Sequence, residues 1–345
     1  MSATEVLDAP HHAEHGEHHH NPFQAHHFDD PEQQYDAGKL GIWLFLVTEV
    51  LFFSGMFCAY AMYRSLHPEV WEFSSRFLNP TLGAFNTGVL LFSSLTMAWG
   101  VRCAQLRQAK GLAICLTLTL GCASIFLGVK AIEYSHKWDL GLLPASMYTI
   151  QSTVTEHHEG ISKWLVIFSI IPALCLAGFV GWWVWAWSNN KKAIADIAGP
   201  FAITAACYFL GVLFGMFFES GGDKEAHGPM AAVAHATVAH DSHEAHDEHA
   251  TVGGSAGGHG TANAADASVD KPGGAGLFFS IYYCMTGVHA LHIIGGMVVL
   301  AWLLVRATKN HFNEEYFGPV DYVGLYWHLV DLIWIYLFPL LYLIT

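Results

Sequence analysis

The sequence predicts an all-α protein, a bundle of transmembrane helices that crosses a bilayer seven times. Of the 345 residues, 53% are hydrophobic and 13% are charged, and apolar runs of about 20 residues recur along the chain. Soluble domains usually contain about 25% charged residues, so this deficit indicates a core that faces lipid. The predicted spans are residues 40–64, 81–102, 111–134, 162–188, 196–218, 275–305 and 323–344.

The basic residues of the short loops predict the orientation. They gather after the second, fourth and sixth spans, at Arg102, Arg107 and Lys110, at Lys191 and Lys192, and at Arg306 and Lys309. Positively charged loops usually stay in the cytoplasm. We therefore expect a multi-pass protein of a bacterial plasma membrane, with a cytoplasmic N-terminus and a periplasmic C-terminus. Residues 1–20 lack the basic and apolar regions of a signal peptide, so we expect the first span to act as the insertion signal.

Two polar segments lie outside these spans. Residues 1–38 form a His-rich tail, and residues 219–274 form an outside loop dominated by Ala, Gly and His, a composition that predicts disorder. His-rich tracts can bind divalent metal ions, but they also occur as solvated linkers, and both readings stay open here. Most of the acidic residues lie in these segments, and no basic patch indicates a nucleic-acid partner.

Glu49 lies close to the middle of the first predicted span. A carboxylate that faces lipid at this depth costs at least about 2.5–3.5 kcal/mol. We therefore expect Glu49 to face a protein interior, a neighbouring subunit or water. It could belong to a proton path, form hydrogen bonds at an interface, or be a tolerated neutral acid. Thr48, Ser54 and Trp43 are its candidate partners within the same helix.

The last two spans contain two pairs of polar residues at a spacing of three. His289 and His292 share one helix face, and they predict either a metal site or hydrogen bonds across a helix interface. Zinc needs three or four ligands, so two histidines alone favour hydrogen bonding. His328 and Asp331 predict either a carboxylate that orients an imidazole or two groups hydrated at the membrane boundary.

Glu133 and Lys130 lie at the end of the third span, again three residues apart. A local ion pair and a functional site are the two readings of this spacing. Other signatures are absent from the sequence: none of the seven cysteines forms a CxxC pair, and there is no CxxCH, no phosphate-binding loop and no GxSxG. We therefore predict no catalytic residue, no metal site and no cofactor in this chain.

Three segments carry a family resemblance: TEVLFFSGMFCAY, TGVHALHIIGGMVV and YWHLVDLIWIYLFPLLYL. They resemble subunit III of the haem-copper oxygen reductases, the cytochrome c oxidase family. Glu133 followed by Tyr134, and the run LNPTLGAFNTGVLL with Asn79 and Asn86, are similar to two further helices of this family. The resemblance covers five spans in the family order, and leaves out 162–188 and 196–218.

The resemblance implies an accessory, non-redox subunit of a proton-pumping cytochrome c oxidase in aerobic respiration. Such a subunit packs on catalytic subunit I in a complex with subunit II, supports stability and proton uptake, and holds phospholipids. Haem and copper belong to the partner subunits. By motif match, Glu49 is the intramembrane carboxylate that faces the catalytic subunit. The other polar positions, at helix interfaces or lipids, are Glu133, His289, His292, His328 and Asp331.

The chain departs from the family pattern in two places. Where the common larger form has two helices before the core, residues 1–38 are polar and cannot span. Residues 145–218 look like an inserted two-helix segment between core helices in 39–144 and 275–345. We expect this hairpin to fill the space of the missing pair or to dock another respiratory complex, with tryptophans that anchor it at the cytoplasmic boundary. These are Trp182, Trp183, Trp185 and Trp187.

Three alternative functions stay open at this point. The same subunit type could serve a quinol oxidase or a nitric oxide reductase, because the electron donor binds elsewhere in such complexes. A protein of a different class, a divalent-metal transporter, could use the His-rich loop. A membrane cytochrome could bind haem through His289 and His328.

Overall fold

The computed structural model describes residues 28–144, 147, 162–241, 275–312 and 316–344. This part of the chain is built from helices and short connections. The helices are α1 (Pro31–Leu66), α2 (Pro68–Ser75), α3 (Pro80–Gln105), α4 (Ala109–Asp139), α5 (Lys163–Ser188), α6 (Lys192–Asp241), α7 (Ala275–Thr308) and α8 (Gly318–Tyr342). Seven of them are long and apolar enough to cross a bilayer. The predictions of an all-α fold and of seven spans are confirmed.

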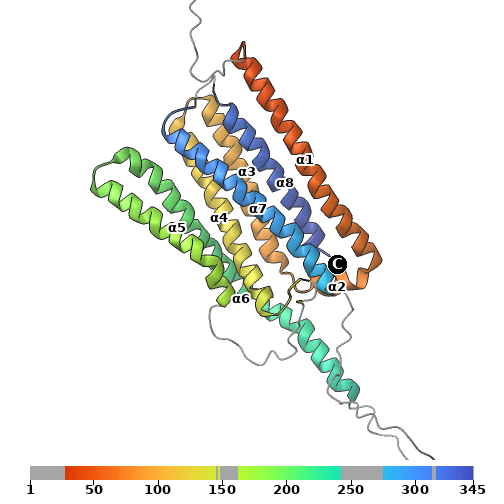
Figure 1. Cartoon of the computed structure of the whole chain (residues 1–345). Helices are drawn as coiled ribbons and strands as arrows, with labels where there is room; N and C mark the ends of the chain where they lie inside the picture. The colour runs from red at the N-terminus through yellow and green to blue at the C-terminus, as the bar shows by residue number, and fades with distance from the viewer. Residues whose placement is uncertain (1–27, 145–146, 148–161, 242–274, 313–315, 345) are drawn as a thin grey trace, which may run out of the picture.

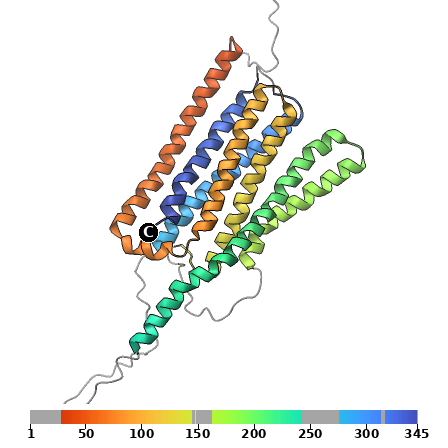
Figure 2. The same cartoon turned by 180° about the vertical axis from the view of Figure 1, so that it is seen from behind.

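The helices α3, α4, α7 and α8 form the centre of the bundle, with α1 on one flank and the α5–α6 hairpin on the other (Figures 1 and 2). α1 packs on α8 and α7, whereas α6 packs mainly on α4 and α5. The turns α3–α4, α5–α6 and α7–α8 lie at the same end of the molecule as the start of α1 (Figure 1). The short α2 closes the other end between α1 and α7.

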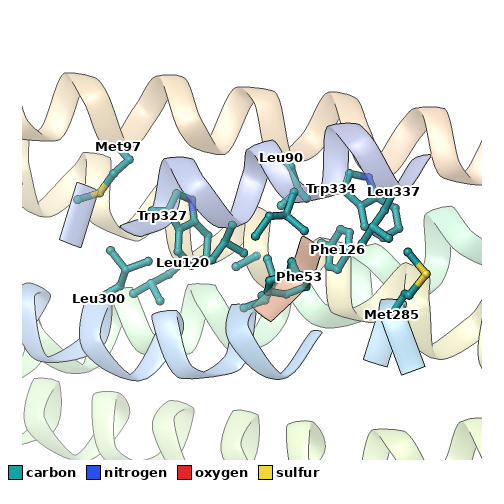
Figure 3. Packing of buried hydrophobic residues seen from close by; sticks show 14 of the residues in the cluster. Phe53, Leu90, Met97, Leu120, Phe126, Met285, Leu300, Trp327, Trp334 and Leu337 are labelled. Atoms are coloured by element: carbon teal, nitrogen blue, oxygen red, sulfur yellow. The ribbon is translucent and has the colours of Figure 1, made fainter. Parts of the chain in front are cut away.

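A large buried core connects the central helices. Phe126 of α4 meets Trp334 of α8 edge to face, with ring centroids 4.9 Å apart. Trp327, also buried, lies about two turns earlier in α8 (Figure 3). Lipid is as apolar as these side chains, so their contacts stabilise the bundle through close packing rather than through removal from water. Hydrogen bonds add specificity, because the indole N–H groups of Trp327 and Trp334 donate to Ser93 (2.9 Å) and Thr87 (3.1 Å) of α3.

Glycines bring α6 and α4 into backbone contact. A Cβ added at Gly128 would lie 2.3 Å from the carbonyl oxygen of Tyr208, and one added at Gly211 would lie 2.3 Å from that of Ile125. Gly211 and Gly215 form a GxxxG spacing, which permits close approach of two membrane helices. The α5–α6 hairpin is therefore seated firmly on α4.

Helix ends differ from the hydropathy boundaries at several points. α1 begins at Pro31 rather than at residue 40, and α2 follows it as an additional short helix. α6 continues to Asp241, although the composition predicts a disordered loop from residue 219. Residues 231–238 read AAVAHATV, and alanine favours the helix strongly. The predicted tail 1–27 and loop residues 242–274 lie outside the described residues.

Candidate functional site

The polar residues singled out in the sequence occupy different places in the bundle. Glu49 and His292 meet between α1 and α7, and Glu133 lies in a cluster between α4, α7 and α8. His289, His328 and Asp331 point into the central bundle at separate positions, described below. The site is therefore a set of buried and partly buried polar groups rather than one pocket.

Glu49 pairs with His292, and its Oε2 lies 2.9 Å from Nε2 of the imidazole. Both side chains are largely covered, with exposed fractions of 17% and 22%. Glu49 belongs to the stripe of α1 that faces the bundle, because Leu46 and Phe53, three and four residues away, are buried. The prediction that Glu49 faces a protein interior is therefore met within its own chain. Its predicted contact with a catalytic subunit stays a prediction.

The predicted local partners of Glu49 are wrong. The hydroxyl of Thr48 donates to the carbonyl of Phe45, and the hydroxyl of Ser54 donates to that of Leu51. Each hydroxyl has a single hydrogen, which is used in this bond to a carbonyl of the preceding turn, so neither hydroxyl donates to the Glu49 carboxylate. Trp43 lies on the outer side of α1 and is exposed.

Besides Glu49, two groups contact the imidazole of His292, and a third holds its backbone. Its Nδ1 lies 2.8 Å from the carbonyl oxygen of Val288, one turn earlier in α7. The ring of Phe53 contacts it at 5.1 Å between centroids. Tyr326 of α8 donates its hydroxyl to the His292 carbonyl at 2.9 Å, which ties this segment of α7 to α8.

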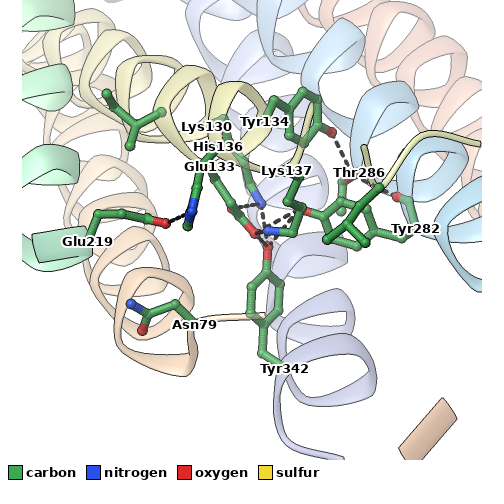
Figure 4. Close-up of polar contacts among 12 residues, drawn as sticks. Asn79, Lys130, Glu133, Tyr134, His136, Lys137, Glu219, Tyr282, Thr286 and Tyr342 are labelled. Atoms are coloured by element: carbon green, nitrogen blue, oxygen red, sulfur yellow. Dashed lines mark hydrogen bonds and ion pairs between the residues drawn. The ribbon is translucent and has the colours of Figure 1, made fainter. Parts of the chain in front are cut away.

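Glu133 lies at the centre of a buried cluster (Figure 4). Its Oε2 accepts from Lys130 Nζ at 2.7 Å, and its Oε1 accepts from Lys137 Nζ at 2.8 Å. Oε1 also accepts from the hydroxyls of Tyr282 (2.7 Å) and Tyr342 (2.5 Å). The side chains of the glutamate and the two lysines are 3–5% exposed. Of the two predictions made for Glu133, the ion pair is confirmed, but it is deeply buried and shared with a second lysine.

Aromatic rings surround the two cations of this cluster. Lys130 Nζ lies 4.5 Å from the ring centre of Trp334 and 5.1 Å from that of Tyr342, and it also donates to the Tyr342 hydroxyl at 2.6 Å. Lys137 Nζ lies 5.2 Å from the ring of Tyr282. The ring faces carry negative charge density, which stabilises an ammonium group. Lys137 was missed in the sequence, although its position four residues after Glu133 gives a sufficient signal.

A second contact joins this region to the hairpin. His136, next to the cluster on α4, pairs through Nδ1 with the carboxylate of Glu219 on α6 (Figure 4). Hydropathy alone gives no reason to connect these two residues, which are 83 positions apart. The pair anchors α6 at the end of its membrane span, beyond the glycine contacts with α4.

The remaining predicted residues do not form pairs with one another. His328 Nδ1 lies 2.5 Å from the hydroxyl oxygen of Ser94 on α3, so the prediction that Asp331 orients this imidazole is wrong. Asp331 is 2% exposed, which also contradicts hydration at a boundary, and neither carboxylate oxygen has a hydrogen-bond partner among the described residues. A spacing of three places two residues on one helix face, but neighbouring helices decide which of them meet.

His289 and His292 do not form one site, because their rings contact different groups. Its ring is fully buried between Phe126 (5.7 Å) and Trp334 (5.2 Å), and within the described ranges neither ring nitrogen has a hydrogen-bond partner. In the part of the chain that the structure describes, no three His, Cys, Asp or Glu side chains gather closely enough to hold a metal ion. The polar residues of the described part of the chain therefore form ion pairs and hydrogen bonds between helices rather than a metal site.

Comparison with known proteins identifies the family to which the chain belongs. The model of the family "Cytochrome c oxidase subunit III" matches residues 22–140 and 270–345, more than half of the chain. The chain belongs to the cytochrome c oxidase subunit III family. It is a multi-pass membrane protein of that family, and the match covers α1 to α4, α7 and α8 but omits α5 and α6.

Individual relatives are similar over shorter stretches. The chain is 39% identical over 70 residues to "Cytochrome c oxidase subunit 3" of Thermostichus vulcanus, which is 20% of this chain and 35% of the relative. It is 40% identical over 65 residues to "Probable cytochrome c oxidase subunit 3" of Mycobacterium leprae (19% and 32%). It is 38% identical over 71 residues to "Heme-copper oxidase subunit I+III" of Aeropyrum pernix (20% and 9%). The chain thus spans about a third or less of these relatives.

Proposed function

We propose that the chain is the accessory, non-redox subunit III of a proton-pumping cytochrome c oxidase in aerobic respiration. The observation that carries this proposal is the family match on both sides of the hairpin, which covers the central bundle and α1. In this role the chain packs on catalytic subunit I, in a complex with subunit II that contains the haem and copper. A relative named "Heme-copper oxidase subunit I+III" supports subunit I as the direct neighbour.

The flank of α1 is the proposed contact with subunit I. Beside the Glu49–His292 pair, α1 exposes the side chains of Phe45 and Phe52, four residues before and three residues after Glu49. A partner helix on this side would cover the remaining exposed part of the pair and keep it out of lipid. We propose that Glu49 supports proton uptake by the catalytic subunit from this position.

The same proposal includes bound phospholipid. A groove of about 560 Å³ lies between the end of α1, the start of α2 and α8, lined by Tyr60, Arg64 and Leu340 among others. A second groove of about 530 Å³, almost entirely apolar, lies between α3, α4 and α6. Both are open, and apolar lining at membrane depth suits acyl chains. We propose that Glu133, His289, His328 and Asp331 serve the packing between helices.

The hairpin and the orientation complete the proposal. α5 and α6 extend the bundle on the flank opposite α1 (Figures 1 and 2), where they fill the space of an absent helix pair or dock another respiratory complex. The three basic turns share one end of the molecule with the start of α1, which supports a cytoplasmic N-terminus and a periplasmic C-terminus.

Purification of the tagged chain from its native membrane tests this proposal. We expect it to co-purify with a haem-copper catalytic subunit and a subunit that contains a copper domain, with the visible spectrum of haem. Co-purification with a catalytic subunit but without the copper-domain subunit would favour a quinol oxidase or nitric oxide reductase. A chain that purifies alone and transports divalent metal in vesicles would overturn the proposal.

Replacement of Glu49 by Gln tests the role of the carboxylate. We expect normal insertion but weaker subunit association or lower sustained turnover, because the substitution removes a carboxyl group that is costly to keep in a membrane helix unless it has a function. Ser54→Ala is the control, since among the described residues this hydroxyl bonds to a carbonyl of its own helix, that of Leu51. Normal assembly and turnover of the Glu49→Gln variant would show that the carboxyl group of Glu49 has no role in either.

A further inference from the structure

The hydrogen bonds of His292 determine where its protons lie. The Val288 carbonyl oxygen can only accept, so the Nδ1 atom at 2.8 Å must carry a hydrogen. The second ring nitrogen, Nε2, faces Glu49 Oε2 at 2.9 Å. A hydrogen bond between these two atoms requires one proton between them, because a bare imidazole nitrogen and a carboxylate would both be acceptors.

This proton can sit at either end of the bond. On Oε2 it gives a neutral carboxylic acid that donates to a neutral imidazole. On Nε2 it gives a carboxylate that accepts from an imidazolium. The total charge of the pair is zero in both arrangements, whereas one more or one fewer proton would leave a net charge. A net charge at this depth in a membrane is unfavourable.

In the described part of the chain, aromatic groups of α1 and α8 surround the pair. Within the described ranges, no Lys or Arg forms an ion pair with Glu49 or His292. The groups that face the pair are the rings of Phe52 and Phe53 from α1 and Tyr326 from α8, whose hydroxyl is committed to the His292 carbonyl. The one other histidine of this helix segment, His289, is turned toward Phe126 and Trp334.

We propose that Glu49 and His292 form a single-proton relay, in which one proton passes between Oε2 and Nε2 while the pair stays neutral. In the transfer the O–H bond of the carboxyl breaks and the N–H bond at Nε2 forms, while the other hydrogen stays on Nδ1 and remains hydrogen-bonded to the Val288 carbonyl oxygen. His292 is then the positioning residue of Glu49, since it lets the carboxylate gain and lose its proton without a net charge in the membrane. The pair would hold this proton whichever respiratory complex contains the chain.

Infrared spectroscopy of the purified complex tests this relay. The difference between wild type and Glu49→Gln isolates the carboxyl signal of Glu49, and we expect His292→Leu to shift that signal to that of a carboxylic acid without its hydrogen bond. In ¹⁵N-histidine spectra, Nδ1 of His292 should be protonated, and Glu49→Gln should change the Nε2 signal. Ser54→Ala should change neither. An unaltered Glu49 signal in His292→Leu, or an unprotonated Nδ1, would overturn the relay.

Turnover gives an independent measurement. If the two residues act as one unit, Glu49→Gln, His292→Gln and the double variant should lower sustained turnover by the same factor. Multiplied losses in the double variant would contradict the relay. His292→Gln keeps a polar side chain, so its spectrum decides the question if His292→Leu fails to assemble. Failure of the relay in these spectra leaves co-purification with a catalytic subunit unaffected, so the two proposals can fail separately.

Discussion

Replacement of Glu133 by Gln removes the only carboxylate of a buried cluster that contains two lysines. The side chain keeps its size, but Lys130 and Lys137 lose the anion that each contacts within 2.8 Å. Two hydroxyls, from Tyr282 and Tyr342, also lose a charged acceptor. Removal of one partner from a buried ion pair costs about 3–5 kcal/mol, because the other charge remains without compensation.

Unfolding of the purified subunit or complex in detergent measures this cost. Glu72→Gln is the matched control, because Glu72 pairs with Arg76 at 3.3 Å while the two side chains are 67% and 56% exposed. Such surface pairs contribute about 0–1 kcal/mol. We expect Glu133→Gln to lower the free energy of unfolding by at least about 3 kcal/mol, within the range for buried pairs.

A second substitution separates charge from packing. Adding Lys130→Met to Glu133→Gln removes one uncompensated cation and keeps an apolar stem of similar length, so part of the lost stability should return. A loss for Glu133→Gln no larger than that for Glu72→Gln would refute the reasoning. It would mean that Lys130 and Lys137 do not depend on the Glu133 carboxylate to compensate their charges.

Three further predictions concern the packing of the outer helices. Gly211→Leu places a side chain against the Ile125 backbone, where a Cβ alone would lie 2.3 Å from the carbonyl oxygen, and should cost at least about 1–3 kcal/mol or detach the hairpin. Gly178→Leu, at a position with nothing within 4 Å of an added Cβ, should leave unfolding unchanged, and equal effects would contradict the observed helix contact. Tyr60→Phe removes the hydroxyl that donates to the Leu340 carbonyl and should lower the free energy of unfolding by about 1 kcal/mol, whereas no change would show that this bond adds nothing. Glu219→Gln weakens the partly exposed pair with His136 and should cost no more than about 1 kcal/mol, and a larger loss would indicate a structural role beyond this pair.

The sequence predicted the spans well, because membrane thickness requires a run of apolar residues that can be counted along the chain. It predicted helix ends less well. Hydropathy marks where a helix leaves the apolar layer, whereas α1 starts earlier at Pro31 and α6 continues to Asp241. Asn79 caps the start of α3, because its side chain accepts a hydrogen bond from the backbone N–H of Thr81, and such a capping residue marks a helix end more closely than hydropathy does.

The partners of the polar residues separate into two kinds. Lys130 and Lys137 lie within one turn of Glu133, so helix spacing can predict their contacts. His292 lies 243 residues from Glu49, and no local pattern connects them. Such contacts depend on which helix faces are adjacent. The GxxxG spacing of α6 likewise indicates a close helix contact without naming α4 as the partner.

The most direct measurement of the accessory role is the time course of oxygen consumption by the purified complex with and without this chain. The account predicts that the complex without it keeps its haem spectrum and its initial rate, but loses activity faster during continuous turnover. Identical time courses would contradict a supporting role, and complete loss of the haem spectrum with the chain would contradict its position outside the redox centres.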